Sequence, residues 1–172
     1  MIGRVALVGA GPGDPGLLTV RGRDLLRSAD VVVYDALISD ALLDLAPATT
    51  RRVFVGKRAG CHAKPQDEIN RLLVQEARAG HFVVRLKGGD PFLFGRGGEE
   101  ALYVTEHGIP LEVVPGVSAV TAVPAAAGIP VTDRGLSSCL VAVTGHEDTS
   151  KSGPRVDWER VSAVPGTLVL FM

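Results

Sequence analysis

Short apolar runs alternate with segments of helical period along this chain, and that alternation is the feature that most constrains its fold. Runs buried on both faces of a sheet read as continuous apolar stretches. We predict such strands at 4–9, 31–34, 52–56, 82–86, 111–114, 139–145 and 167–171. Strands separated by helices favour a mainly parallel sheet covered by helices, so the sequence predicts an α/β fold.

The helix boundaries carry their own signals. We predict one helix over 15–28, with Asp14 as its N-cap and a proline at its first position. Segment 65–79 is the clearest helix, and Gly80 suits the left-handed position after its end. Its apolar face carries Ile69, Leu72, Leu73 and Ala77. Further helices are expected over 98–107, from a cap at Ser118, and near Trp158.

Composition excludes some partners and compartments. The 172 residues are 46% apolar and 22% charged, enough for a substantial core, and the net charge of −1 favours neither nucleic acid nor an anionic membrane as a partner. Neither a signal peptide nor an apolar run long enough to cross a membrane is present. Cys61 and Cys139 lie far apart without a CxxC spacing. We expect a cytoplasmic protein.

Three glycine-rich loops follow three of the predicted strands. They are GAGPGDPG after the first strand, KGGDPFLFGRGG after the strand near 84, and PGVSA after the strand near 113. In parallel sheets, ligands bind outside the carboxyl ends of strands, where glycines allow close backbone approach. Each glycine could instead only turn the chain. Three such loops together favour a ligand site.

The first loop also fits the dinucleotide fingerprint G-x-G-x-x-G. Asp35, at the end of VVVYD, has the spacing of the acidic residue that binds a ribose in that motif. However, Pro12 and Pro15 each remove an N–H from the turn that would donate to a pyrophosphate. The ligand of this loop therefore need not carry a phosphate.

Five motifs in order give a more specific indication. VALVGAGPGDPGLLTVRG, ADVVVYDALIS, VFVGKRAGCHAKPQDEIN, VVRLKGGDPFLFGRGGEE and VVPGVSAVTAVPAAAGIPVTDR resemble the uroporphyrinogen-III C-methyltransferases of the tetrapyrrole methylase family. The resemblance implies two α/β domains with S-adenosylmethionine held in the cleft between them. We place an N-terminal domain at 1–112 and a partial C-terminal domain at 113–172. The family's second domain continues further, so we expect a truncated chain with an exposed apolar strand at 167–171 and reduced activity.

The resemblance also implies which residues contact the methyl donor. These are Pro12, Gly88, Gly89, Asp90, Leu93, Ser118, Ala119 and Met172. A sulfonium with an amino-acid tail and an adenosine needs backbone hydrogen bonds, an apolar bed and a nearby carboxylate. Asp90 could supply that carboxylate by accepting from the ribose hydroxyls or the amino group, or it could act only as a loop cap.

The implied acceptor is uroporphyrinogen III, a cyclic tetrapyrrole poly-acid that is methylated at two ring carbons. Precorrin-1 would be the intermediate and precorrin-2 the product, with S-adenosylhomocysteine released. The family pattern makes Asp35 a general base and Lys57 a proton donor. Lys57 and Arg58 could instead only pair with substrate carboxylates. Whether the product feeds siroheme or cobalamin synthesis stays open.

Several cations lie in or beside the same motifs and are candidates for binding the acceptor's carboxylates, since arginine forks suit carboxylates. They are Arg58, Arg85, Lys87, Arg96 and Arg134. Each could instead be a solvated surface charge. Cys61 and His62 are too few for a metal site, and we expect no metal. The resemblance implies a homodimer. A nicotinamide-dependent oxidoreductase and a fragment without activity are the alternatives.

Overall fold

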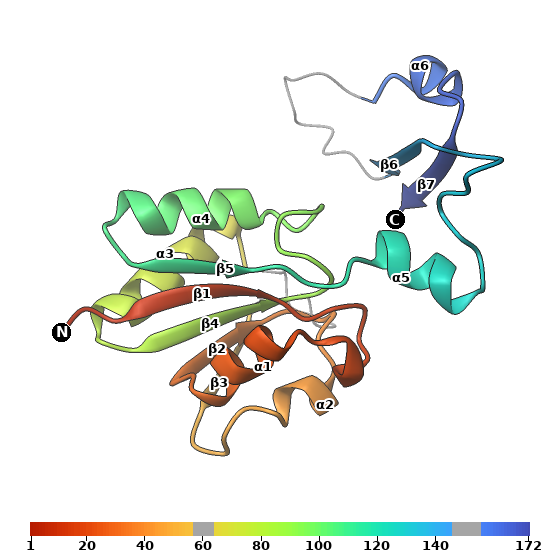
Figure 1. The fold of residues 1–172 in the computed structure, drawn as a ribbon. Coiled ribbons are helices and arrows are strands. Elements are labelled where there is room, and N and C mark those ends of the chain that lie inside the picture. The colour runs from red at the N-terminus through yellow and green to blue at the C-terminus, as the bar shows by residue number, and fades with distance from the viewer. Residues whose placement is uncertain (57–63, 146–155) are drawn as a thin grey trace. The chain divides into compact units, whose positions relative to one another are not determined.

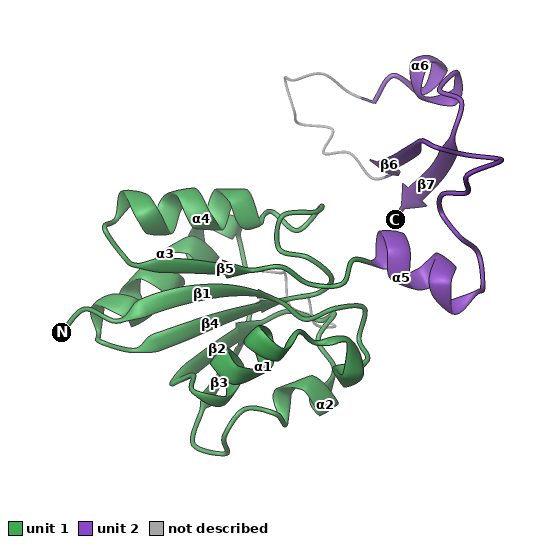
Figure 2. Cartoon of the chain, viewed as in Figure 1, with its two compact units in different colours: residues 1–118 green, residues 119–172 purple. Residues whose placement is uncertain are grey.

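The computed structural model describes residues 1–56, 64–145 and 156–172. These residues form two compact units, Met1–Ser118 and Ala119–Met172, and each is described by itself. Figure 2 colours the two units separately. The sequence placed the domain boundary after residue 112, but the strand at 111–114 pairs within the sheet of unit 1, so this unit extends through Ser118.

Unit 1 contains a parallel sheet, as the sequence predicted. Its strands, in the described part of the chain, are β1 (Arg4–Gly9), β2 (Val31–Tyr34), β3 (Arg51–Phe54), β4 (Phe82–Lys87) and β5 (Leu111–Val114). The strand order is β3-β2-β4-β1-β5, and every neighbouring pair is parallel. The predicted α/β fold is therefore confirmed (Figure 1).

The register brings the carboxyl ends of the strands to one edge. Val8 of β1 lies opposite Leu86 of β4 and Val114 of β5, and Tyr34 of β2 also lies opposite Leu86. The loops that follow β1, β2, β4 and β5 therefore start at the same edge of the sheet. This arrangement places the glycine-rich loops side by side.

Helices cover both faces of this sheet (Figure 1). They are α1 (Val20–Arg27), α2 (Asp40–Leu43), α3 (Gln66–Arg78) and α4 (Gly97–Glu106). Because side chains alternate along a strand, Val8 of β1 packs in one core with α1 and α2. Leu7 points to the other face and packs in a second core with α3 and α4. Both faces of the sheet are thus removed from water.

The prediction of one helix over 15–28 was wrong. Asp14 accepts a hydrogen bond from Gly16 N (2.7 Å) and caps the short 3-10 helix η1 (Pro15–Leu17). Leu18 then returns to extended backbone, and Thr19 caps α1 by accepting from Gly22 N (3.0 Å). The side chains of Asp14 and Thr19 each bond to the backbone two or three residues later, so two separate helices form in place of one continuous helix. The four-residue α2 was not predicted, because its apolar pattern is too short.

The helix over 65–79 is confirmed in α3, with Gly80 at a φ of 95° after its end. Its buried face differs in part from the predicted one. Leu72 is only half-buried, whereas Asn70 and Glu76 are buried beside the apolar residues. These polar side chains are buried because other groups of unit 1 pair with them, which a helical period does not reveal.

Unit 2 is smaller and less covered. Its described elements are α5 (Ala119–Ala126), β6 (Leu140–Thr144), α6 (Trp158–Ser162) and β7 (Thr167–Phe171). β6 and β7 pair in parallel. Leu168 and Leu170 of β7 are 42% and 61% exposed, which agrees with the apolar exposure expected for this strand. Among the described residues, no helix is long and apolar enough to cross a membrane.

Candidate functional site

The loops after β1 and β4 are joined through their glycines. Gly11 N donates to Gly89 O (3.2 Å), and Gly89 N donates to Gly11 O (2.8 Å). Ala10 N also donates to Lys87 O at 2.7 Å. Gly11 and Gly89 form an antiparallel bridge just beyond the parallel pairing of β1 with β4, so the two loops are fixed to each other where the strands end.

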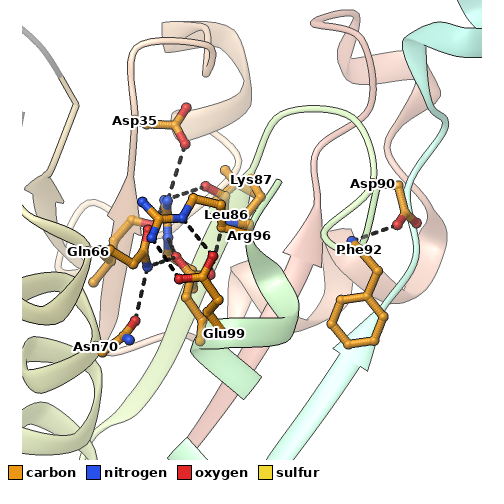
Figure 3. A network of polar contacts seen from close by, with 12 residues as sticks. Asp35, Gln66, Asn70, Leu86, Lys87, Asp90, Phe92, Arg96 and Glu99 are labelled. Atoms are coloured by element: carbon orange, nitrogen blue, oxygen red, sulfur yellow. Dashed lines mark hydrogen bonds and ion pairs between the residues drawn. The ribbon is translucent and has the colours of Figure 1, made fainter. Parts of the chain in front are cut away.

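Asp90 ties the third glycine-rich loop to these two loops. Its Oδ2 accepts from Gly116 N (3.0 Å) and its Oδ1 accepts from Phe92 N (2.8 Å). Both contacts are those of a loop cap, the alternative role considered for Asp90. Figure 3 shows the one with Phe92. A contact from Asp90 to the methyl donor stays a prediction.

The glycines of these loops serve two different needs. A Cβ on Gly116 would lie 2.1 Å from Gly89 O, and one on Gly9 would lie 2.5 Å from Gly116 N, so these two glycines allow the loops to pack together. Gly89 has a φ of +65°. If Gly89 carried a Cβ, the nearest atom to it would be Ser118 Cα, at 4.0 Å. The space over Gly89 is thus open within unit 1, as close approach of a ligand to backbone requires.

The loop after β1 lacks the geometry of a dinucleotide site. In that motif the glycine-rich turn leads directly into a helix whose N-terminus faces the pyrophosphate. Here the turn leads into the three-residue η1, and α1 begins only at Val20 after its own cap. The match to G-x-G-x-x-G is therefore accidental, as the prolines indicated.

The other predicted donor contacts fall in both units. Pro12 and Leu93 are exposed in unit 1, and Ser118 is its last residue. Ala119 and Met172 belong to unit 2, where Met172 is 79% exposed. Within unit 1, the predicted contacts in the loops after β1 and β4 do meet at one edge. The contribution of unit 2 stays a prediction.

Asp35 lies at the same edge, directly after β2. Its Oδ1 accepts from Leu37 N (3.1 Å), which holds the turn, and its Oδ2 accepts from Arg85 Nη2 at 3.3 Å. The side chain is 26% exposed. Asp35 is thus held by an arginine at the end of a strand and still reaches solvent, and its role as a general base stays a prediction.

Arg85 and Lys87 belong to a buried network beside Asp35. Arg85 Nε donates to Glu100 Oε1 (3.2 Å), and Lys87 Nζ lies 2.9 Å from Glu100 Oε2. Burial, with repulsion from Arg85, lowers the pKa of Lys87 below its ordinary value, against the opposing effect of Glu100. Figure 3 shows this network, with Asp35 and Lys87 labelled.

The candidate substrate cations therefore differ in their surroundings. Arg85 and Lys87 are each 4% exposed and already paired, so their predicted role in binding substrate carboxylates stays without support from their positions. Arg96 is exposed and pairs with Glu99 at 2.7 Å, and Arg134 is exposed in unit 2. The remaining candidates lie outside the described residues: Lys57, Arg58, Cys61 and His62.

Sequence reasoning did not single out Glu100, Gln66 or Asn70. Gln66 Nε2 donates to Asn70 Oδ1 (3.0 Å) and to Glu100 Oε1 (3.1 Å), which links α3 to α4. A signal for Glu100 existed, because it stands four residues before the buried Val104 on the inner face of α4. In the part of the chain that the structure describes, no group of three His, Cys, Asp or Glu side chains could hold a metal ion.

Known proteins resemble this chain over nearly its whole length. An S-adenosyl-L-methionine-dependent uroporphyrinogen III methyltransferase of Methanosarcina barkeri is 53% identical over 170 residues, which cover 99% of this chain and 67% of that protein. A siroheme synthase of Escherichia coli is also 53% identical over 99% of this chain, but over 36% of its own length.

A solved structure agrees with these similarities. Uroporphyrin-III C-methyl transferase from Thermus thermophilus, complexed with S-adenyl homocysteine, matches with a TM-score of 0.80 and 49% identity, over 99% of this chain and 66% of that chain. The family model of the Tetrapyrrole (Corrin/Porphyrin) Methylases matches residues 4–172, which includes both units. This chain belongs to the tetrapyrrole (corrin/porphyrin) methylase family.

Proposed function

We propose that this chain carries the S-adenosylmethionine-dependent C-methylation of uroporphyrinogen III at two ring carbons, by way of precorrin-1, to give precorrin-2. The observation that carries the proposal is the 53% identity to a uroporphyrinogen III methyltransferase over 99% of the chain. The loops joined through Gly11 and Gly89 add a physical argument, since the space over Gly89 is open to a ligand. Pro12 and Pro15 lack the N–H groups that would bind a phosphate, so the first loop suits a ligand without phosphates.

The donor, when bound, supplies an electrophilic methyl group on a sulfonium. A pyrrole carbon of the acceptor forms the new C–C bond while the S–CH3 bond breaks, so the protein's main task is to hold the two reactants in line. We assign donor binding to Pro12, Gly88, Gly89, Asp90, Leu93, Ser118, Ala119 and Met172. The open space over Gly89 supports this assignment within unit 1.

The methylated ring then carries a positive charge and must lose a proton. We assign Asp35 as the base that accepts this proton, because it reaches solvent at the ligand edge while Arg85 holds its Oδ2. Lys57 is the proposed proton donor from its family motif. Arg58, Arg96 and Arg134 are the proposed partners of substrate carboxylates. A homodimer in the cytoplasm completes the proposal.

The function is tested by assaying the full-length protein that carries this sequence. Incubation with S-adenosylmethionine and uroporphyrinogen III should add two methyl groups, which mass spectrometry detects. Isothermal titration should show binding of S-adenosylhomocysteine and no binding of NAD(H). Binding of NAD(H) with no methyl transfer would overturn the proposal in favour of an oxidoreductase.

Asp35→Asn tests the assignment of the base. We expect the affinity for S-adenosylmethionine to stay within a few-fold while the rate of methyl transfer falls by roughly 100-fold or more, the scale of losing a general base. Asp44→Asn is a matched control, because Asp44 also pairs with an arginine at 3.2 Å but is exposed elsewhere on unit 1. A large loss of donor affinity with little change in turnover would make Asp35 a binding residue instead.

A further inference from the structure

Glu100 is a charged side chain at the end of the motif VVRLKGGDPFLFGRGGEE, and neither the resemblance nor the proposed chemistry gives it a role. It is fully buried on the inner face of α4, between Gly97 and Val104. Removing a carboxylate from water is costly unless other charges and hydrogen bonds compensate for it. A glutamate in this position therefore needs partners, and the identity of those partners indicates what it does.

Two of the partners of Glu100 lie on β4, close to the edge of the sheet where the glycine-rich loops start. Oε1 accepts from Arg85 Nε (3.2 Å) and from Gln66 Nε2 (3.1 Å), and Oε2 pairs with Lys87 Nζ at 2.9 Å. Lys87 is the last residue of β4, next to the glycines of the loop that joins Gly11. From α4, Glu100 thus fixes the carboxyl end of β4 through its ion pairs with Arg85 and Lys87.

Arg85 connects Glu100 to Asp35. Besides its bond to Glu100, the guanidinium donates through Nη1 to the carbonyl oxygens of Val33 (3.4 Å) and Leu86 (3.1 Å). These bonds fix the plane of the guanidinium, so that Nη2 meets Asp35 Oδ2 at 3.3 Å. The Asp35 carboxylate is therefore oriented by Arg85, and the same guanidinium is held by Glu100 through its Nε. Figure 3 shows the network around the labelled Asp35 and Lys87.

The charges of this network balance. Arg85 and Lys87 carry two positive charges, Asp35 and Glu100 two negative ones, and Asp35 is the member that reaches solvent. Without the charge of Glu100, Asp35 would be the only carboxylate of the network for two buried cations. A carboxylate engaged by two cations is a poorer proton acceptor.

We infer that Glu100 is a positioning residue for the reaction: it neutralises Arg85 and Lys87 and so keeps Asp35 oriented and available as a base. The inference rests on the proposed function of Asp35. It assigns Glu100 no contact with either substrate. Its loss should therefore lower turnover while donor binding changes little.

Glu100→Gln in the full-length protein tests this directly. We expect kcat to fall by about 100-fold, the scale of misplacing a reacting group, with the KM for S-adenosylmethionine within a few-fold. Glu76→Gln is the matched control, because Glu76 is also a buried glutamate paired with an arginine. Its other partner, His81, lies just before the first residue of β4, at the opposite end of this strand from Lys87. Equal kcat in the two variants would overturn the inference.

Two further variants separate charge from folding. Glu100→Asp keeps the charge and should retain more of kcat than Glu100→Gln, although it packs less well. Combining Glu100→Gln with Lys87→Met leaves one cation, Arg85, and one carboxylate, Asp35. Because the charges balance again, the kcat of this double variant should be about 10-fold higher than that of Glu100→Gln. If Glu100→Gln alone does not fold, the double variant is compared with the unmodified protein, and its kcat should lie about 10-fold lower. A loss of about 100-fold or more in that comparison would then contradict the inference. A double variant as slow as Glu100→Gln, or slower than it, would contradict the role of charge balance.

The unmodified protein separates this inference from the function on which it rests. Absence of methyl transfer by the unmodified protein would reject the proposed function itself. Normal methyl transfer by the unmodified protein, together with unchanged kcat in Glu100→Gln, would reject only the role of Glu100.

Discussion

The strands β1 and β7 have similarly apolar sequences but different surroundings. Five of the six residues of β1 are buried, whereas β7 alternates between half-buried and exposed residues. β1 lies between β4 and β5 with a core on each face, while β7 pairs with β6 within the described part of unit 2. An apolar run thus predicts a strand, but its neighbours decide how many of its faces are covered.

The largest expected difference between the two units is in core truncation. Leu7→Ala should lower the free energy of unfolding by about 2–5 kcal/mol, because Leu7 is fully buried and leaves a cavity. Leu170→Ala should cost less than about 1 kcal/mol, since Leu170 is 61% exposed. Urea unfolding followed by circular dichroism measures both. Equal losses would mean that β7 is covered in solution, by a second copy or by further chain.

Glycine substitutions should separate the units by a smaller amount. Gly116→Ala places a Cβ 2.1 Å from Gly89 O and should cost about 1–3 kcal/mol of stability, the range of overpacking. Gly128→Ala, in unit 2, meets no described atom within 4 Å and should cost only about 1 kcal/mol for its φ of +71°. Thermal unfolding of both variants tests this. A smaller loss for Gly116→Ala would show that the loops of unit 1 can separate at little cost.

The smallest expected difference concerns ion pairs and pH. Burial alone would raise the pKa of Glu76, but hydrogen bonds from Arg51 and His81, with their charges, lower it below its ordinary value of 4.5. A lowered pKa means that the carboxylate stabilises the fold above about pH 4.5 and loses this contribution as the pH falls below that value. We therefore expect the stability difference between the unmodified protein and Glu76→Gln to shrink below pH 4.5.

The control for this pH effect lies in unit 2. Asp157 pairs with Arg160 at 3.1 Å, and both side chains are exposed. Asp157→Asn should change the free energy of unfolding at pH 7 by less than about 1 kcal/mol, because exposed pairs contribute little and asparagine caps a helix as well as aspartate. Unfolding curves at several pH values measure both variants. If the stability of Glu76→Gln followed the same pH dependence as that of the unmodified protein, the expected difference between the Glu76 and Asp157 pairs would be contradicted.

Local signals predicted most elements of the fold. The strands at 4–9, 31–34, 111–114 and 167–171 were predicted with the bounds that the structure has, because each apolar run is flanked by turn or helix signals. The helix over 15–28 was mispredicted. Asp14 and Thr19 each cap a separate helix, but they stand so close in the sequence that the apolar pattern indicates only one helix start. The candidate site was predicted through its glycines, which strand order brings to one edge.

The sequence by itself determined the α/β alternation, the glycine-rich loops and Asp35 at the end of a strand. Only the tertiary structure decided which charges are buried. Glu99 and Glu100 are neighbours with the same chemistry, yet Glu99 is exposed and Glu100 has no exposed surface. Their fates differ because the rotation of α4 against the sheet turns one inward. The spacing of four residues from Val104 indicates that Glu100 shares its helix face. The buried partners of Glu100 come from residues distant in sequence, so no local pattern shows that its charge can be buried.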